Sequence, residues 1–279
     1  MKDFSKYKLN LKPSPKDKRD LKVSAVLREI ELPPRTNNRT LMFAVRDQME
    51  QGSCAAMAGA GMKEYQEVKD YGLKAYPSPQ FIYNSREDPN EEGMYLRDLM
   101  KILQNRGVCF EKLYPYLTMK KPSAEALANA LNFRIDNYAA IDSMYGLKLA
   151  LHIKGPCVIA VPVYNYTERM WAQRPGDNFL GGHAMLAVDY DDDTETILIR
   201  NSWSEEWGDE GYCKMSYMDY ELMWEAWSSI DAESAKTTTD TPVTTPAPHE
   251  GWFKRWGVWI LLGITVVVIS LFLSKWIAG

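Results

Sequence analysis

Residues 48–72 read QMEQGSCAAMAGAGMKEYQEVKDYG, a polar segment that leads into a long apolar repeat. After Cys54 the apolar residues recur at spacings of three and four, which predicts a helix with one buried stripe. Ser53 is a good N-cap and Gly72 suits a left-handed C-cap, so we expect the helix to begin at Cys54 and to end before Gly72. The stripe contains Met57, Ala58, Gly61, Met62, Tyr65 and Val68.

The position of Cys54 gives its thiol a specific chemistry. A thiol at a helix N-terminus lies among free backbone N–H groups, at the positive end of the helix dipole. This environment favours the thiolate, which is the nucleophilic form. The alternative interpretation is a buried cysteine that packs as a small apolar residue, and the rest of the chain has to decide between the two.

The composition narrows the classes of function. The chain has 279 residues, enough for one large or two small domains, and a net charge of −4, which gives no electrostatic argument for nucleic-acid binding. Its four cysteines lack the C-x-x-C spacing of zinc sites and redox dithiols. The charged N-terminus lacks the apolar core of a secretory signal peptide. We therefore expect a reducing compartment and no metal, cofactor or nucleic acid, and the oligomeric state stays open.

The first 231 residues divide into three segments. Residues 1–40 are an N-terminal arm, basic and polar as far as residue 30, with a short strand expected at 29–34. Residues 41–133 carry the helical period, and residues 134–231 change to the two-residue period of strands. A cleft between two such halves is a common place for an active site. Besides the helix after Cys54, helices are expected from Ser78 and over 94–105, 123–131 and 143–153, and strands over 134–141, 157–163, 183–190, 195–201 and 211–217.

Two further segments end the chain. Residues 232–251 hold six threonines and three prolines and read as an extended linker. Within the final segment, 252–279, residues 257–274 are uncharged and numerous enough to span a bilayer as one transmembrane helix. Tryptophans and basic residues flank this span, as at membrane interfaces. A buried core helix is the alternative, but the span is apolar all round, so we expect a C-terminal membrane anchor.

Of the three histidines, His183 has the best setting for a catalytic base. His249 lies in the linker, and His152 lies near the end of a helix, as a surface residue would. His183 opens an apolar strand directly after two glycines, which allow another backbone or a substrate to come close. Asn201 follows in the motif Asn-Ser-Trp, and Gln48 precedes Cys54.

These motifs resemble the papain family of cysteine peptidases. The order Cys, His, Asn matches that family, in which the His and Asn lie about 130–150 residues after the Cys. The resemblance covers residues 31–217 and rests on Gln48, Cys54, Gly182-His183-Ala184, Asn201-Ser202-Trp203 and the Trp-Gly-x-x-Gly-Tyr motif at 207–212. Residues 78–81 and 107–116 resemble the subgroup of bacteria, archaea and large DNA viruses, which has a short N-terminal arm in place of a long inhibitory propeptide.

The resemblance implies a papain-like, two-domain α+β fold with a helical half and an antiparallel, β-barrel-like half. It also implies a cysteine endopeptidase that hydrolyses peptide bonds through a thioester. Cys54 would be the nucleophile, His183 the base and Asn201 the residue that orients it, while Gln48 and the Cys54 N–H would stabilise the oxyanion. By the same resemblance, the substrate-binding residues are Gly93, Met94, Gly182 and Trp203, and Trp203 also shields the His–Asn hydrogen bond.

Four positions depart from the family's pattern. Gln51 replaces a cysteine that forms a disulfide in secreted members, and Ala55 replaces the usual aromatic residue. Ser204 and Asp189 stand where glycine is usual, and they could crowd the cleft or alter its charge. The substrate preference is therefore not carried over, although every catalytic group is present.

The alternative to an active peptidase is an idle papain-like scaffold held on a membrane. Acyl transfer is a third class, but it usually orients the histidine with Asp, and Asn201 argues against it. A tail-anchored protein with a cytoplasmic body, for example on a viral or virion membrane, is the expected topology. The threonine-rich linker and glycosylation tripeptides at 38–40 and 165–167 support the opposite one. We also expect residues 1–30 to cross or approach the cleft and to modulate activity on a peptide or protein substrate.

Overall fold

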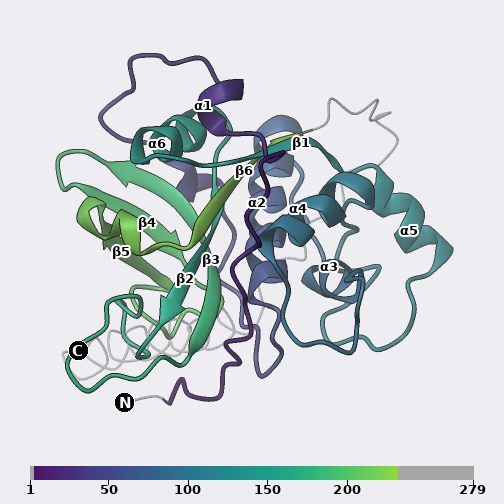
Figure 1. Cartoon of the computed structure of the whole chain (residues 1–279). Helices are drawn as coiled ribbons and strands as arrows, with labels where there is room; N and C mark the ends of the chain where they lie inside the picture. Colours follow the sequence, from purple (N-terminus) through teal and green to yellow (C-terminus); the bar gives the residue numbers. More distant parts are fainter. Residues whose placement is uncertain (1–2, 232–279) are drawn as a thin grey trace, which may run out of the picture. The chain divides into compact units, whose positions relative to one another are not determined.

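The computed structural model describes residues 3–231 (Figure 1). The linker at 232–251 and the anchor at 252–279 lie outside the described residues. Helices α2 to α5 precede all strands of the described part, so the change from helical to strand period after residue 133 is confirmed. Figure 1 shows α3, α4 and α5 on one side of α2 and the sheet on the other.

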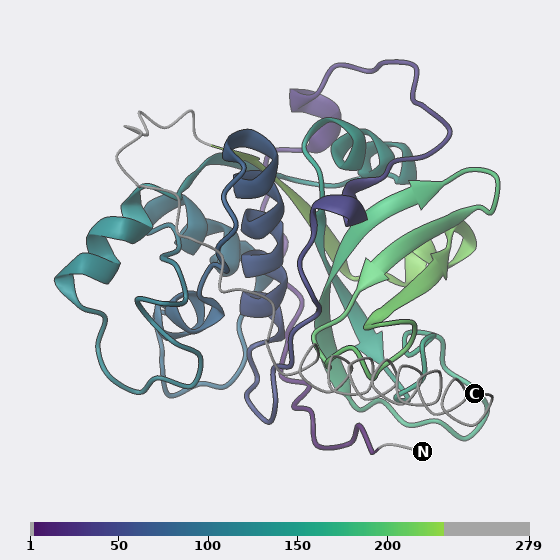
Figure 2. The same ribbon diagram turned by 180° about the vertical axis from the view of Figure 1, so that it is seen from behind.

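Helix α2 (Cys54–Tyr71) begins and ends where the sequence predicts, and Gly72 adopts the left-handed conformation with φ 64°. Two details of the prediction are wrong. The Ser53 side chain makes no capping hydrogen bond, because its hydroxyl lies 2.6 Å from the hydroxyl of Tyr116. The helix is buried from Cys54 to Glu67 on every side rather than along one stripe, because the sheet and the other helices enclose it (Figure 2).

The other helices follow their capping signals. The hydroxyls of Ser78, Ser123 and Ser143 accept a backbone N–H from the first turns of α3, α5 and α6, respectively. These helices therefore begin one residue after each serine. The bounds are α3 Pro79–Asn84, α4 Leu96–Asn105, α5 Ala124–Leu131 and α6 Met144–Ile153, with short turns at α1 Val23–Val26, η1 Asn38–Leu41 and η2 Tyr217–Leu222.

The strands form one antiparallel sheet in the order β1-β6-β2-β3-β4-β5. In this order β1 and β5 are edge strands, so within residues 3–231 the sheet is open rather than a closed barrel. Strand β6 is not predicted by the sequence. The bounds are β1 Ile135–Ala140, β2 Cys157–Val163, β3 Gly181–Asp191, β4 Thr196–Arg200, β5 Tyr212–Ser216 and β6 Glu225–Asp231.

The core lies on both faces of the sheet. Val158 and Ala160 of β2 pack in the cluster that contains α2 and α4, whereas Ile159 and Val161 pack in the cluster that contains α6. Because both faces are covered, β2 and β3 are apolar almost without interruption. This packing fixes the position of the first residues of β3, where His183 lies.

The N-terminal arm runs along the boundary between the helices and the sheet (Figure 1). No strand forms at 29–34, contrary to the prediction, but the carbonyls of Pro33 and Pro34 accept the Tyr190 hydroxyl and the Asp192 N–H at the end of β3. Further back, the arm forms isolated bridges from Asn10 to Gly182 and from Lys22 to Ala140. The arm therefore crosses the molecule at the first residues of β3.

Candidate active site

Cys54 and His183 are brought together by α2 and β3. The backbone N–H of Ala184, the residue after His183, acts on the Cys54 sulfur, so the thiol lies directly beside the start of β3. The Nε2 atom of His183 lies 2.7 Å from Oδ1 of Asn201. The other ring nitrogen, Nδ1, is buried and has no hydrogen-bond partner in the described part of the chain.

Trp203 covers the histidine and its partner. Its ring centroid lies 4.8 Å from that of His183, and its side chain is fully buried. Trp207 packs edge-on against Trp203, with centroids 5.8 Å apart. The hydrogen bond between His183 and Asn201 is therefore shielded from water, as the sequence predicts for Trp203.

Gln48 is held in a fixed orientation at the start of the loop 48–53, which precedes Cys54 and which we call the nucleophile loop. Its side-chain oxygen accepts a hydrogen bond from the Ser202 hydroxyl at 2.7 Å, and its Nε2 donates to the Gln51 carbonyl at 3.1 Å. The Gln48 N–H also donates to the Ser202 carbonyl at 2.8 Å. An amide nitrogen carries two hydrogens, so one remains for an oxyanion.

Burial opposes the ionisation that the sequence predicts for Cys54. Burial raises the pKa of the Cys54 thiol to about 11, although the backbone N–H groups of Ala184, Ala55 and Cys54 itself act to lower it. Burial likewise lowers the pKa of His183 to about 4, against the raising effect of Asn201. In this conformation burial thus opposes the thiolate that the helix N-terminus favours.

Cys54 is only 1% exposed, and a short piece of the arm lies against three glycines of this region. The Leu11 N–H donates to the Gly182 carbonyl at 3.2 Å. A side chain added to Gly93 would lie 2.1 Å from the carbonyl oxygen of Asn10, and one added to Gly52 would lie 3.2 Å from its amide oxygen. Three glycines from separate segments therefore make room for one short piece of the arm.

Two of the predicted substrate-binding residues, Gly93 and Gly182, thus contact the arm directly. The aromatic side chain of Tyr7 stacks on Trp203, with centroids 5.0 Å apart and planes 6° apart. Met94 is different, because its side chain is 9% exposed and belongs to the core cluster around α2. The arm therefore lies against two of the residues that the resemblance assigns to substrate binding.

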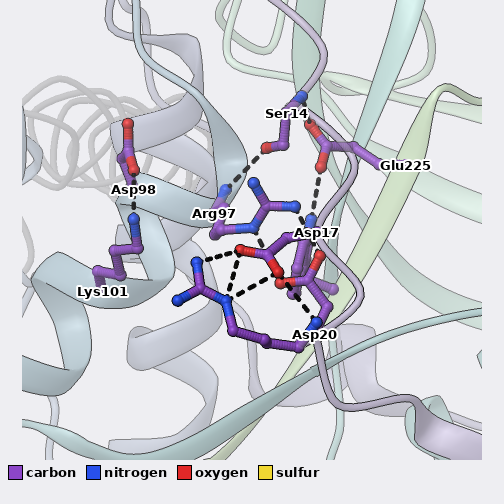
Figure 3. Close-up of polar contacts among 9 residues, drawn as sticks. Ser14, Asp17, Asp20, Arg97, Asp98, Lys101 and Glu225 are labelled. Atoms are coloured by element: carbon purple, nitrogen blue, oxygen red, sulfur yellow. Dashed lines mark hydrogen bonds and ion pairs between the residues drawn. The ribbon is translucent and has the colours of Figure 1, made fainter.

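Figure 3 shows where the arm is fastened beyond the site. The Arg97 guanidinium donates to both carboxylate oxygens of Asp20, at 2.9 and 2.6 Å, and the two side chains are only 12% and 13% exposed. Ser14 accepts the Arg97 N–H at 3.2 Å and donates its own N–H to Glu225 at 2.9 Å. We call these contacts of Ser14 and Asp20 with Arg97 and Glu225 the latch.

The positions that depart from the family's pattern have local explanations. The Asp189 carboxylate accepts the N–H groups of Asn38 and Arg39, so this acid caps η1. Ser204 adopts φ 68°, a conformation that favours glycine. Gln51 donates to Gln80 of α3 at 2.9 Å and so ties the nucleophile loop to the helical half without a disulfide.

Several residues that shape the site or hold the arm were not identified from the sequence. Ser202 lies within the recognised motif, but its contact with Gln48 joins residues far apart in the chain. Gly52 lies two residues before Cys54, and a glycine there was a usable signal for close approach. Tyr7, Asn10 and Arg97 carry no local signal, because their roles depend on the path of the arm.

Comparisons with known proteins agree with this geometry. The model of the papain family cysteine proteases matches residues 32–230. An uncharacterized peptidase C1-like protein of Acanthamoeba polyphaga mimivirus is 30% identical over 197 residues, covering 61% of this chain and 63% of that protein. Cathepsin K of Gallus gallus is 30% identical over 184 residues, 60% of this chain and 53% of the relative. The matched region thus spans less than two thirds of these relatives.

A solved structure shares the fold over nearly its whole length. Xylellain, a cysteine protease from Xylella fastidiosa, superimposes with a TM-score of 0.72 at 29% identity. The match covers 83% of this chain and 99% of that one.

Proposed function

The chain belongs to the papain family of cysteine proteases, and we propose that it is an endopeptidase that acts through Cys54, His183 and Asn201. The observation that supports this most strongly is the orientation of His183. Its Nε2 lies 2.7 Å from Oδ1 of Asn201, and its buried Nδ1 has no hydrogen-bond partner in the described part of the chain. The N–H of the next residue, Ala184, acts on the Cys54 sulfur. A base held in this way is suited to one task, exchange of a proton with the sulfur.

The proposed reaction proceeds in two halves. The Nδ1 atom of His183 takes the thiol proton as the Cys54 sulfur attacks the peptide carbonyl carbon. Gln48 Nε2 and the Cys54 N–H stabilise the oxyanion, and His183 returns the proton to the leaving amine as the C–N bond breaks. Water, deprotonated by His183, then attacks the thioester and releases the carboxylic acid product and the thiol.

We further propose that the described conformation is a closed one. A substrate backbone cannot approach Gly93 and Gly182 while Asn10 and Leu11 occupy that space. Opening the arm would return water to Cys54 and His183, which removes the desolvation that keeps both groups neutral. The arm would then control access to the site and the ionisation of its nucleophile together.

The experiment is labelling of the full chain, in detergent, with an epoxide or vinyl-sulfone probe for cysteine peptidases. We expect labelling in the wild type, faster labelling in Arg97→Gln, whose latch is weakened, and none in Cys54→Ala. Cleavage of a peptide blocked at both ends would establish endopeptidase activity. Folded protein that neither labels nor cleaves, with or without the latch substitution, would favour the idle scaffold.

Membrane anchoring through 257–274, with the body in the cytoplasm, is part of the proposal. Within residues 3–231, no helix is long and apolar enough to cross a bilayer. The buried Asn38 donates its amide hydrogens to the carbonyls of Leu151 and Val188, so the tripeptide at 38–40 is poorly suited to glycosylation. The mimivirus relative supports a viral source. Flotation of the full chain with liposomes, lost on deletion of 257–274, is the expected result.

A further inference from the structure

The segment before Gly93 forms one wall of the region that the arm occupies, and it is strongly acidic. A cavity of about 180 Å³ lies here, beside Asn10 and Lys12 of the arm. Arg86, the one basic residue that the body contributes to this cavity, donates to the Pro89 carbonyl and lies over the Tyr83 ring. The acidic residues of the wall are Glu87, Asp88, Glu91, Glu92 and Asp98.

A peptide is already bound along this wall, namely the arm itself. Lys8 forms an ion pair with Glu92, and the Asn10 amide donates to the same carboxylate at 3.2 Å. Lys12 lies 3.6 Å from Glu91. In an extended chain, residues two apart point to the same side, so residues 8, 10 and 12 all face the acidic wall.

The opposite side of the same segment is apolar. Leu11 is 3% exposed and packs in the core cluster around α2, and Leu9 packs against the cluster around α6. The arm therefore presents polar and basic side chains to the acidic wall, while its leucines pack in two separate apolar clusters. A substrate that displaces the arm meets the same acidic wall.

We infer that Glu91 and Glu92 select substrates with lysine or arginine at a position that lies along this wall. This inference rests on the proposed peptidase function and names its substrate class, basic peptides. The ion pairs of Lys8 and Lys12 are partly exposed, and pairs of this kind contribute modestly and are screened by salt. The expected preference is therefore about 1.5- to fivefold at low salt and smaller at high salt.

The test compares peptides that differ at one position, lysine against norleucine, scanned from four residues before the scissile bond to two after it. The ratio of kcat/KM values is measured for each pair with the full chain. Both peptides of a pair compete with the same arm, so the ratio does not depend on how often the arm opens. Vinyl-sulfone probes carrying lysine or norleucine give the same ratio from labelling rates when turnover is slow.

The wild type is expected to prefer lysine at one or two positions, and the double variant Glu91→Gln, Glu92→Gln to lose that preference. Asp193→Asn, an exposed carboxylate on the β3–β4 turn, is the control and should keep it. A ratio near one in the wild type, or an unchanged ratio in the double variant, would overturn the inference while leaving peptidase activity intact. Absence of both cleavage and labelling would overturn the proposed function together with it.

Discussion

The Ser202 hydroxyl donates a 2.7 Å hydrogen bond to the side-chain oxygen of Gln48, and both residues are buried. This contact decides which end of the Gln48 amide faces the nucleophile loop, because the oxygen is already engaged. Ser202 is therefore a positioning residue that acts through Gln48.

We expect Ser202→Ala to lower kcat about tenfold with little change in KM, because a lost buried hydrogen bond of about 1.4 kcal/mol would loosen the oxyanion donor. Gln48→Ala should cost more, about 10²–10³ in kcat. Ser202→Thr keeps the hydroxyl and should recover much of the rate. Steady-state kinetics on one peptide with all three variants checks this, and an equal loss in the Ala and Thr variants would contradict it.

The latch gives a prediction about access. Removing one partner of the largely buried pair Arg97–Asp20 destabilises the closed arm. Arg97→Gln and Asp20→Asn should each speed labelling of Cys54 by about tenfold or more. The double variant should be no faster than either single one, because both remove the same interaction.

Lys101→Gln is the matched control for the latch. Lys101 lies on the same helix, α4, but pairs with the exposed Asp98 (Figure 3). Its labelling rate should equal that of the wild type. A strictly additive effect of Arg97→Gln and Asp20→Asn would show that the two residues hold the arm independently.

His183 gives a prediction about how the stability of the fold depends on pH. The pKa of His183 is lowered to about 4 in the folded protein, whereas an unfolded histidine titrates near 6.5. Between these values the unfolded chain binds the extra proton, so this contribution to stability is complete above about pH 6.5 and is lost as the pH falls toward 4. Urea unfolding at pH 7, 6 and 5 should show a smaller loss in His183→Gln than in the wild type. His152→Gln, at an exposed position on α6, should behave like the wild type.

Ser204 gives a prediction about stability alone. Its φ of 68° is costly for a residue with a Cβ, by about 1–2 kcal/mol. Ser204→Gly removes that cost but loses the 3.3 Å hydrogen bond from the Glu206 N–H and adds backbone freedom to the unfolded chain. We expect a net rise in melting temperature of a few degrees. Ser204→Ala keeps the strain and loses the hydroxyl, so it should lower the melting temperature, and a fall in the Gly variant would refute the strain.

Local signals in the sequence located most of the fold. Ser78, Ser123 and Ser143 fixed three helix starts, and the continuous apolar run of β2 fixed a strand covered on both faces. Strand β6 was missed because it buries polar residues, including Ser229, whose hydroxyl accepts a hydrogen bond from Gln66. A pattern of apolar and polar residues assigns such serines to the surface.

Buried polar residues also explain why the prediction of a single buried stripe on α2 was wrong. Lys63 is fully buried and pairs with Glu67 at 3.0 Å, so charged residues lie on the side that the period assigned to solvent. In the site, the resemblance to the papain family implied that His183 and Asn201 meet, and they do. It did not predict that Asn10 lies on Gly93, because that contact joins the arm to a distant loop, nor that burial raises the pKa of Cys54.

In the proposed closed conformation, the alkylation rate of the Cys54 thiol reports the opening of the arm. The other three cysteines, Cys109, Cys157 and Cys213, are buried in the body, and burial raises the pKa of each. Alkylation under native conditions is therefore expected to modify Cys54 and to leave the other three cysteines unmodified. At low reagent concentration its rate follows the equilibrium between closed and open chains, and at saturating concentration it follows the opening step itself, as in the two regimes of hydrogen exchange. A single mass-spectrometric time course thus separates how often the arm opens from how fast it does so.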